Sequence, residues 1–357
     1  MGKPCVAVEF IPLLCTSQAA VWNNSYVQKL MIAIGGIVVL LVLVGLALPQ
    51  HARVVASLEI DARPATVFAL VNDFDRVALW SPWLATDPNA RVEISGPDSG
   101  TGASMSWDGL IIGSGSQVII TSKPFERIET TINPGETSNA RSVFEFRDTG
   151  STTVVDWTFE TDYGYNLVGR YTALLLNGVI RRDYEHGLRR LAQLAESLPR
   201  TDFSDLDVEH IVVEAEDIAF RETSSRPDPD STAEALGKAY FRVLNFIDAH
   251  DLQEAGPPML ISRSFDGSKI RFDAAIPVRG VVADTPIDNA GIKVGETYGG
   301  PAIRVRHRGQ YRNLVQTHRK ITSYLAAHGI ERNGDAWESF VNDPTNVAES
   351  EILTDVY

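Results

Sequence analysis

The stretch that decides the fold of the first soluble part runs from Val54 to Asp73 and reads VVASLEIDARPATVFALVND. Apolar and polar residues alternate over 54–60, which predicts a half-buried β-strand. Pro64 predicts the start of a short helix that continues through Val71, because proline is tolerated in the first helical turn. The residues before and after this strand and helix are interpreted in relation to them.

Short β-rich segments separated by turn residues follow this opening, and a long helix closes it. We predict strands near 90–95, 102–109, 115–122, 126–132, 140–147 and 152–160. Apolar residues then recur every three or four positions at Ile180, Tyr184, Leu188, Leu191, Ala195 and Leu198. This spacing predicts one buried helix face, which would pack on the sheet and can leave a cavity beneath it.

Residues 62–73, followed by Trp80-Ser81-Pro82-Trp83, resemble the opening of the polyketide-cyclase/START-like superfamily, also called SRPBCC. Later segments at 102–107, 124–128 and 184–188 fit the same family. The resemblance implies a helix-grip domain over 52–200 with a cavity for an apolar ligand. Trp80, Trp83 and Trp107 are candidate cavity residues, and the alternative for each is a packing role in the core.

Residues 208–357 show an internal duplication. A strand at 209–220, a helix at 231–250 and strands at 257–263 and 269–278 form the first half. A strand at 302–308, a helix at 312–328 and strands at 337–341 and 351–357 repeat the pattern. Two strand-helix-strand-strand halves predict a pseudo-two-fold α+β domain with a cleft between them.

This second part resembles the gyrase-inhibitor-like, or AraC-type, effector-binding domain, a ligand sensor of several bacterial transcription activators. The matching segments are 256–258, 272–278, 307–311 and 336–344, the last reading AWESFVNDP. In relatives the acidic residue at the position of Glu338 points into an aromatic-lined pocket. The resemblance therefore implies that Glu338 pairs with a cationic, apolar ligand, or serves as the acid/base of a small-molecule hydrolase.

Alternation along a strand places Glu338 and Phe340 on one face and Trp337 on the other. Tyr311, at the start of the second helix, is expected by the resemblance to border the cleft and to act as a polarising donor if the protein is an enzyme. Trp337 and Tyr240 are further ligand-binding candidates, with a core position as the alternative. Glu338 itself has the alternative of an exposed strand residue.

The N-terminal segment predicts a single-pass membrane helix over 30–50. Residues 30–50 carry no charge, and the stretch 31–48 would span about 27 Å as a helix, close to the bilayer core of about 30 Å. A cleaved signal peptide is the alternative, although its apolar run is usually shorter. Residues 1–29 form an unusual tail, and we expect the true start near Val27 or Met31. The short leading segment favours soluble domains outside the cytoplasm.

Composition limits the remaining classes of function. The 46 acidic against 32 basic residues give a net charge of -14, which disfavours nucleic acid as a direct partner. Both cysteines, Cys5 and Cys15, precede the apolar segment, so we expect no thiolate metal site or cysteine nucleophile in the soluble parts. We also expect no cofactor or metal. The seven histidines, at 51, 186, 210, 250, 307, 318 and 328, fit no metal-ligand motif and are interpreted as structural.

The sequence therefore predicts an α+β protein with a membrane helix, a START-like domain, a linker at 201–207 and an effector-type domain. The predicted function is to sense or sequester hydrophobic or cationic compounds. A hydrolase that uses Glu338 is the enzyme alternative, and a structural or protein-partner module is the third. Ligand identity and oligomeric state stay open.

Overall fold

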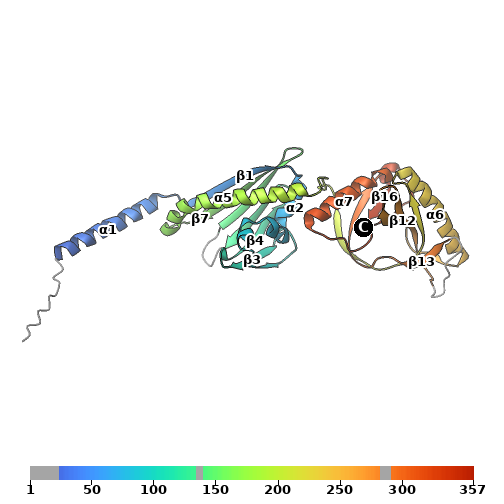
Figure 1. Ribbon diagram of the computed structural model, residues 1–357, viewed down its shortest axis with the longest axis horizontal. Helices are drawn as coiled ribbons and strands as arrows, with labels where there is room; N and C mark the ends of the chain where they lie inside the picture. The colour runs from blue at the N-terminus through green and yellow to red at the C-terminus, as the bar shows by residue number, and fades with distance from the viewer. Residues whose placement is uncertain (1–23, 134–139, 282–290) are drawn as a thin grey trace, which may run out of the picture. The chain divides into compact units, whose positions relative to one another are not determined.

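The computed structural model describes residues 24–133, 140–281 and 291–357 (Figure 1). Of the predicted tail at 1–29, residues 1–23 lie outside the described residues. The architecture is mixed α+β, as predicted, with an N-terminal helix and two antiparallel sheets.

Helix α1 (Asn24–Ala47) is the apolar N-terminal helix. Its residues Tyr26–Ala47 are long and apolar enough to cross a membrane, a property that a signal sequence would share. Arg170, which is only 2% exposed, donates hydrogen bonds from Nη1 to the carbonyl oxygens of Gly45, Leu46 and Leu48 at 3.1–3.2 Å. The last carbonyls of a helix have no intrahelical partner, so this guanidinium caps the end of α1.

The first sheet holds seven strands in the order β1-β7-β6-β5-β4-β3-β2. Its strands are β1 (His51–Ile60), β2 (Arg91–Ser95), β3 (Ser104–Gly109), β4 (Gly113–Lys123), β5 (Arg127–Asn133), β6 (Ala140–Asp148) and β7 (Thr153–Asp162). Each predicted strand is present with slightly shifted ends, and β2 to β7 form the predicted antiparallel meander.

Three short helices connect β1 to β2. Pro64 occupies the first turn of α2 (Pro64–Asn72), as predicted. The helices α3 (Phe74–Trp80) and α4 (Pro82–Thr86) were not predicted from the sequence. Both begin at side-chain caps, since Asp73 accepts from the backbone N–H of Asp75 and Ser81 accepts from that of Leu84.

Helix α5 (Leu167–Ser197) is the long helix that follows β7. The predicted face at Tyr184, Leu188, Leu191 and Ala195 is buried in the core of the first domain. However, α5 begins at Leu167, more than three helical turns before the point where the sequence pattern started. The apolar residues of these earlier turns lie on a different helix face from the predicted one, so extending the predicted stripe did not reveal them.

The second sheet follows the order β13-β9-β12-β11-β15-β16-β14-β8, with β10 (Gln253–Glu254) paired to β12 beside this path. Its members are β8 (Val208–Val213), β9 (Asp217–Ser225), β11 (Met259–Phe265), β12 (Ile270–Arg279), β13 (Ile292–Glu296), β14 (Gly300–Arg308), β15 (Trp337–Phe340) and β16 (Leu353–Val356). The strands on the two sides of the β11–β15 pair correspond to each other, since β12, β9 and β13 on one side match β16, β14 and β8 on the other. This correspondence is the predicted pseudo-two-fold symmetry. Helix α6 (Pro229–Ala249) belongs to the first half and α7 (Leu314–His328) to the second.

Two features of this sheet differ from the prediction. The predicted strand at 209–220 is two strands, β8 and β9, broken at 214–216. The break is required because β8 pairs with β14 and β9 pairs with β12 and β13, toward opposite ends of the strand order. Strand β13 was not predicted, because its short alternation lies among glycines at 291, 295, 299 and 300 that indicate a connector.

Two single turns of 3₁₀ helix, η1 (Tyr311–Asn313) and η2 (Glu349–Glu351), precede α7 and β16. The predicted second helix, 312–328, therefore begins as η1 and continues as α7. The C-terminal end of α7 is closed by Gly329, whose φ of 67° is the left-handed conformation that glycine adopts without a steric penalty.

Candidate functional site

A cleft of about 1190 Å³ lies in the second domain, lined by residues of α6, α7 and the strands β11, β12 and β15. Strand alternation in β15 directs Glu338 and Phe340 into this cleft, as predicted. In the register, Glu338 lies opposite Leu260 of β11 and Val356 of β16. The acidic residue therefore comes from the centre of the sheet, where both flanking strands fix its backbone.

Glu338 is hydrogen-bonded to His318 of α7. The distance from Nε2 of His318 to Oε1 of Glu338 is 2.7 Å, and the side chains are 32% and 13% exposed. Among the described residues no hydrogen bond reaches Oε2 of Glu338. His318 thus holds the Glu338 carboxylate by Oε1 and leaves Oε2 free for a ligand or a reacting group.

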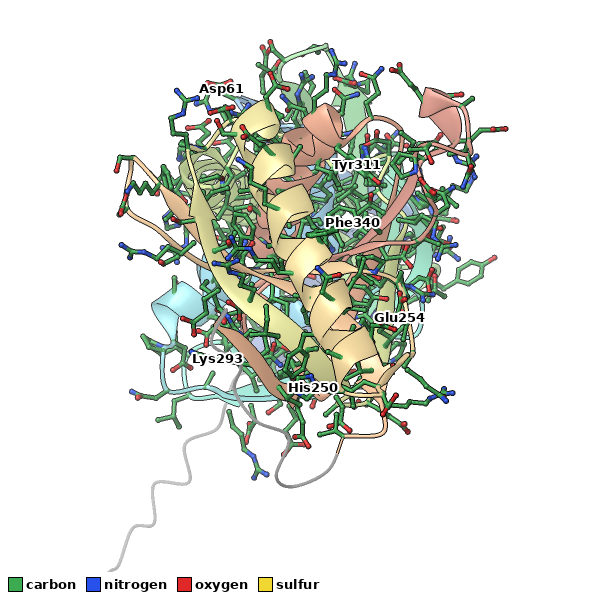
Figure 2. All side chains as sticks on the ribbon, turned by 90° about the vertical axis from the view of Figure 1, so that its right-hand side faces the viewer. Asp61, His250, Glu254, Lys293, Tyr311 and Phe340 are labelled. Carbon is green, nitrogen blue, oxygen red and sulfur yellow. The ribbon has the colours of Figure 1, made fainter. Side chains whose placement is uncertain are left out.

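Three aromatic residues that the sequence singled out lie around this carboxylate. Tyr311 and Phe340 pack edge to face with ring centroids 5.2 Å apart, and Figure 2 labels them one above the other beside α6. Tyr240 donates its hydroxyl hydrogen to the carbonyl of Met259 at 2.8 Å, so its ring lines the cleft while its polar end is satisfied.

Burial and the neighbouring carboxylate raise the pKa values of both tyrosines. The pKa of Tyr240 lies well above 10, mainly because of burial and then because of the charge of Glu338. Burial also raises the pKa of Tyr311, with Asp343 and Glu338 adding to the effect. Both hydroxyls therefore keep their protons at neutral pH and can act only as hydrogen-bond donors or neutral acceptors.

Charged residues of both signs border the cleft. Its lining contains Asp228, Asp335 and Asp343 besides Glu338, and it also contains Arg263, Arg271, Arg312 and Arg332. Arg263 is already engaged, since it donates to Asp273 at 2.7 Å and to Asp335 at 2.6 Å. The anionic character is therefore local to Glu338 and is not a property of the whole rim.

Trp337 does not enter this cleft. It lies on the opposite face of β15, where its ring stacks on Tyr357 at 4.6 Å with an interplanar angle of 6°. The two rings line a separate hollow of about 450 Å³. The sequence placed Trp337 on this face, and its role as a ligand-binding residue stays a prediction.

A second, smaller cavity of about 250 Å³ lies in the first domain. All three candidate tryptophans, Trp80, Trp83 and Trp107, line it. Trp80 is 2% exposed and donates its indole hydrogen to the carbonyl of Leu70 at 2.8 Å, so it is both a core and a lining residue. Trp83 is 36% exposed and packs edge to face on Trp157. Within the described part of the chain, no Asp, Glu, Lys, Arg or His side chain lines this cavity.

Tyr184 of α5 brings a polar atom to this cavity. It is 1% exposed, its ring stacks on Trp157, and its pKa is raised by burial. The nearby Trp157 indole N–H already donates to the Ser142 hydroxyl at 2.7 Å. Ser142 and Trp157 lie near the Tyr184 hydroxyl and oppose the rise of its pKa less than burial promotes it, but among the described residues neither is in hydrogen-bond geometry with this hydroxyl. A buried hydroxyl without a partner is costly and can be satisfied by a ligand oxygen.

Sequence reasoning missed His318 and did not consider Tyr184 as a site residue. A signal for His318 was present, because it falls at the helical spacing of the inward residues Leu314, Ile321 and Leu325. Its contact with Glu338 depends on how α7 packs on the sheet and could not be deduced from spacing. In the ranges that the structure describes, no group of three or more His, Cys, Asp or Glu side chains could hold a metal ion.

Comparisons with known proteins place each domain in a family. Residues 51–196 match the model for polyketide cyclase / dehydrase and lipid transport, and residues 226–357 match the model for the GyrI-like small molecule binding domain. Each of the two resemblances seen in the sequence is therefore confirmed by a family model that matches its part of the chain. No curated protein matches the chain.

Similar solved structures each span less than half of the chain. A protein from Chromobacterium violaceum is 16% identical over 42% of this chain and 99% of its own, with a TM-score of 0.32. The C-terminal domain of EcmrR is 12% identical over 43% and 95%, with a TM-score of 0.35. A hydrolase from Listeria innocua is 12% identical over 42% and 89%, with a TM-score of 0.32.

Proposed function

We propose that this chain is a membrane-anchored protein that senses or sequesters small molecules at two sites of different chemistry. Residues 30–50 would form the single-pass anchor, with the soluble parts outside the cytoplasm. The domain over 52–200 would take an apolar ligand, and the domain over 208–357 would take an amphipathic cation. Residues 201–207 would link them. Two small-molecule-binding families in one chain support this proposal.

The observation that carries the cation site is the half-engaged carboxylate of Glu338. One oxygen is held by His318, the other has no described partner, and Tyr240, Tyr311 and Phe340 surround it. An anionic oxygen beside aromatic faces attracts a cation with an apolar body, because ion pairing and cation–π attraction act together. His318 is a positioning residue in this proposal, since it fixes the carboxylate from the side of α7.

Calorimetric titration of the full chain in lipid nanodiscs tests this site. The probes are tetraphenylphosphonium, which carries a positive charge, and triphenylphosphine oxide, which is neutral and of similar bulk. We expect the cation to bind with at least tenfold higher affinity than the neutral probe, after subtraction of empty nanodiscs. Equal affinities would show that Glu338 does not select charge and would contradict the proposal.

The hydrogen bond between His318 and Glu338 supports a second candidate function, hydrolysis of a small electrophile. A carboxylate within hydrogen-bond reach of a histidine is a pair that can transfer protons, and Tyr311 could polarise the substrate. The two candidates are distinguished by replacing Glu338 with Gln. Hydrolysis would stop while apolar binding persisted, whereas in a binding protein the cation affinity would fall and no product would form in either variant.

A further inference from the structure

The first turn of α5 lies beside the C-terminal end of the apolar helix α1. Tyr171 donates its hydroxyl hydrogen to the carbonyl of Leu41 at 2.6 Å, and Arg170 caps the end of α1. Leu41 lies between one and two helical turns before Ala47, which corresponds to about 9 Å along the helix axis. Leu167 and Tyr171 also crowd Gly45, where a Cβ atom would meet their side chains at 3.1–3.3 Å. The beginning of α5 is therefore at the level of the last turns of α1.

An exposed apolar stripe continues from this contact along α5. Val168, Tyr171, Leu175 and Val179 follow one another at spacings of three, four and four, which places them on one helix face. Val168 is 73% exposed and Leu175 is 78% exposed. The positions 169, 170 and 173 are buried on the other side of the same turns. Val168 and Leu175 therefore lie on an exposed helix face, where a soluble domain would carry polar residues.

This segment carries basic but no acidic side chains. Residues 163–182 contain no Asp or Glu, although the whole protein has a net charge of -14. They contain Arg170 and, at the end of the apolar stripe, the exposed pair Arg181 and Arg182. Apolar residues followed by arginines are typical of helices that lie in the interface of a bilayer, where the guanidinium groups reach the headgroups.

We infer that the first half of α5, from Leu167 to Val179, is an interfacial helix embedded in the bilayer that α1 crosses. This inference rests on the proposed membrane anchor and goes beyond it, because a spanning helix alone requires no second contact with lipid. Its apolar face would enter the boundary of headgroups and acyl chains by about 5–10 Å. The next residues of the helix, Ile180 and Tyr184, line the cavity of the first domain.

Site-directed spin labelling of the full chain in vesicles of phosphatidylcholine and phosphatidylglycerol tests the inference. Cys5 and Cys15 are replaced with Ser, and single cysteines are placed at Val168 or Leu175. Val39 of α1 provides the lipid reference, and exposed Glu185, farther along α5, provides the water reference. All four labelled positions lie on the surface, so labelling leaves the core unchanged. The collision rates of each label with oxygen and with a nickel chelate are then compared.

We expect labels at 168 and 175 to collide with oxygen more often than with the nickel chelate, between the values at 39 and 185. Nickel access at 168 and 175 equal to that at 185, with 39 still protected, would overturn the inference and leave the anchor intact. Protection from both reagents with dipolar broadening would show a second copy of the chain on the stripe and would also overturn it. Nickel access at 39 would remove the anchor itself, and with it this inference.

Discussion

The candidate sites of the two domains differ in size and, above all, in charge. The cavity of the first domain is about 250 Å³, and Tyr184 is the one ionisable group among its described lining residues. The cleft of the second domain is about 1190 Å³ and places Glu338 among aromatic rings. Transfer of a charge into an apolar cavity without a partner is strongly unfavourable. The two sites are therefore suited to different ligands, and neither can replace the other.

The largest expected effect comes from removing the negative charge of the cleft. We expect Glu338→Gln to weaken binding of tetraphenylphosphonium by about 30- to 150-fold, or about 2–3 kcal/mol, because a desolvated charge partner is lost. Binding of triphenylphosphine oxide would change little. Calorimetry measures both affinities. The matched control is Glu254→Gln, an exposed carboxylate near the C-terminal end of α6, which is predicted to leave both affinities unchanged (Figure 2).

The next largest effect is expected at the residue that positions this carboxylate. His318→Ala removes the hydrogen bond to Oε1 of Glu338 and lets the Glu338 side chain move. We therefore expect a three- to tenfold loss of cation affinity, or about 1 kcal/mol. His318→Gln can still donate a hydrogen bond and would recover part of the loss. The same calorimetric titration measures both variants. A gain of affinity in the Ala variant would instead mean that His318 competes with the ligand.

The corresponding test in the first domain is Tyr184→Phe. Removing a buried hydroxyl without a partner is expected to raise the free energy of unfolding by about 1 kcal/mol, as measured by thermal unfolding of the full chain. The cation affinity of the second domain would not change. Destabilisation by Tyr184→Phe would show that the hydroxyl is satisfied in the ligand-free protein, and the cavity would then lack the polar contact assigned to it.

The effect expected from pH is confined to alkaline solution. Burial raises the pKa values of Tyr184, Tyr240 and Tyr311, whereas an unfolded tyrosine titrates near pH 10. The stability that the folded protein gains from these protonated tyrosines is complete below about pH 10. It is lost above that pH, because the tyrosines of the unfolded chain release their protons first. Unfolding measured between about pH 8 and 11 would show the decline. The Phe variants of Tyr184 and Tyr240 would each flatten it, and an unchanged slope in both would contradict the assignment.

Most of the fold could be predicted from the sequence, because alternation and helical spacing report burial directly. Helical spacing was followed along one face only. The first half of α5 carries its apolar residues on the opposite face, so its beginning at Leu167 was missed. The break between β8 and β9 and the presence of β13 depend on pairing partners far away in the chain, which local patterns do not contain.

The candidate sites were predicted less completely than the fold. Glu338, Phe340, Tyr311 and Tyr240 line one cleft. The resemblance implied this position for Glu338 and Tyr311, whereas strand alternation placed Phe340 beside Glu338 and Tyr240 had a core position as its alternative. His318 was missed, because its meaning comes from the packing of α7 against β15. A hydrogen bond between a helix and a strand that are separate in the chain follows from tertiary structure and leaves no spacing signature.

Trp337 gives the second domain an optical reporter. It is joined directly to Glu338 but faces the other side of the sheet, stacked on Tyr357. The remaining tryptophans all precede it, at positions 22, 80, 83, 107 and 157. A ligand in the first cavity would quench indole fluorescence by contact, whereas a ligand at Glu338 would alter the emission of Trp337 through the strand without touching it. We therefore expect ligands at the two sites to change the indole emission of the protein in different ways.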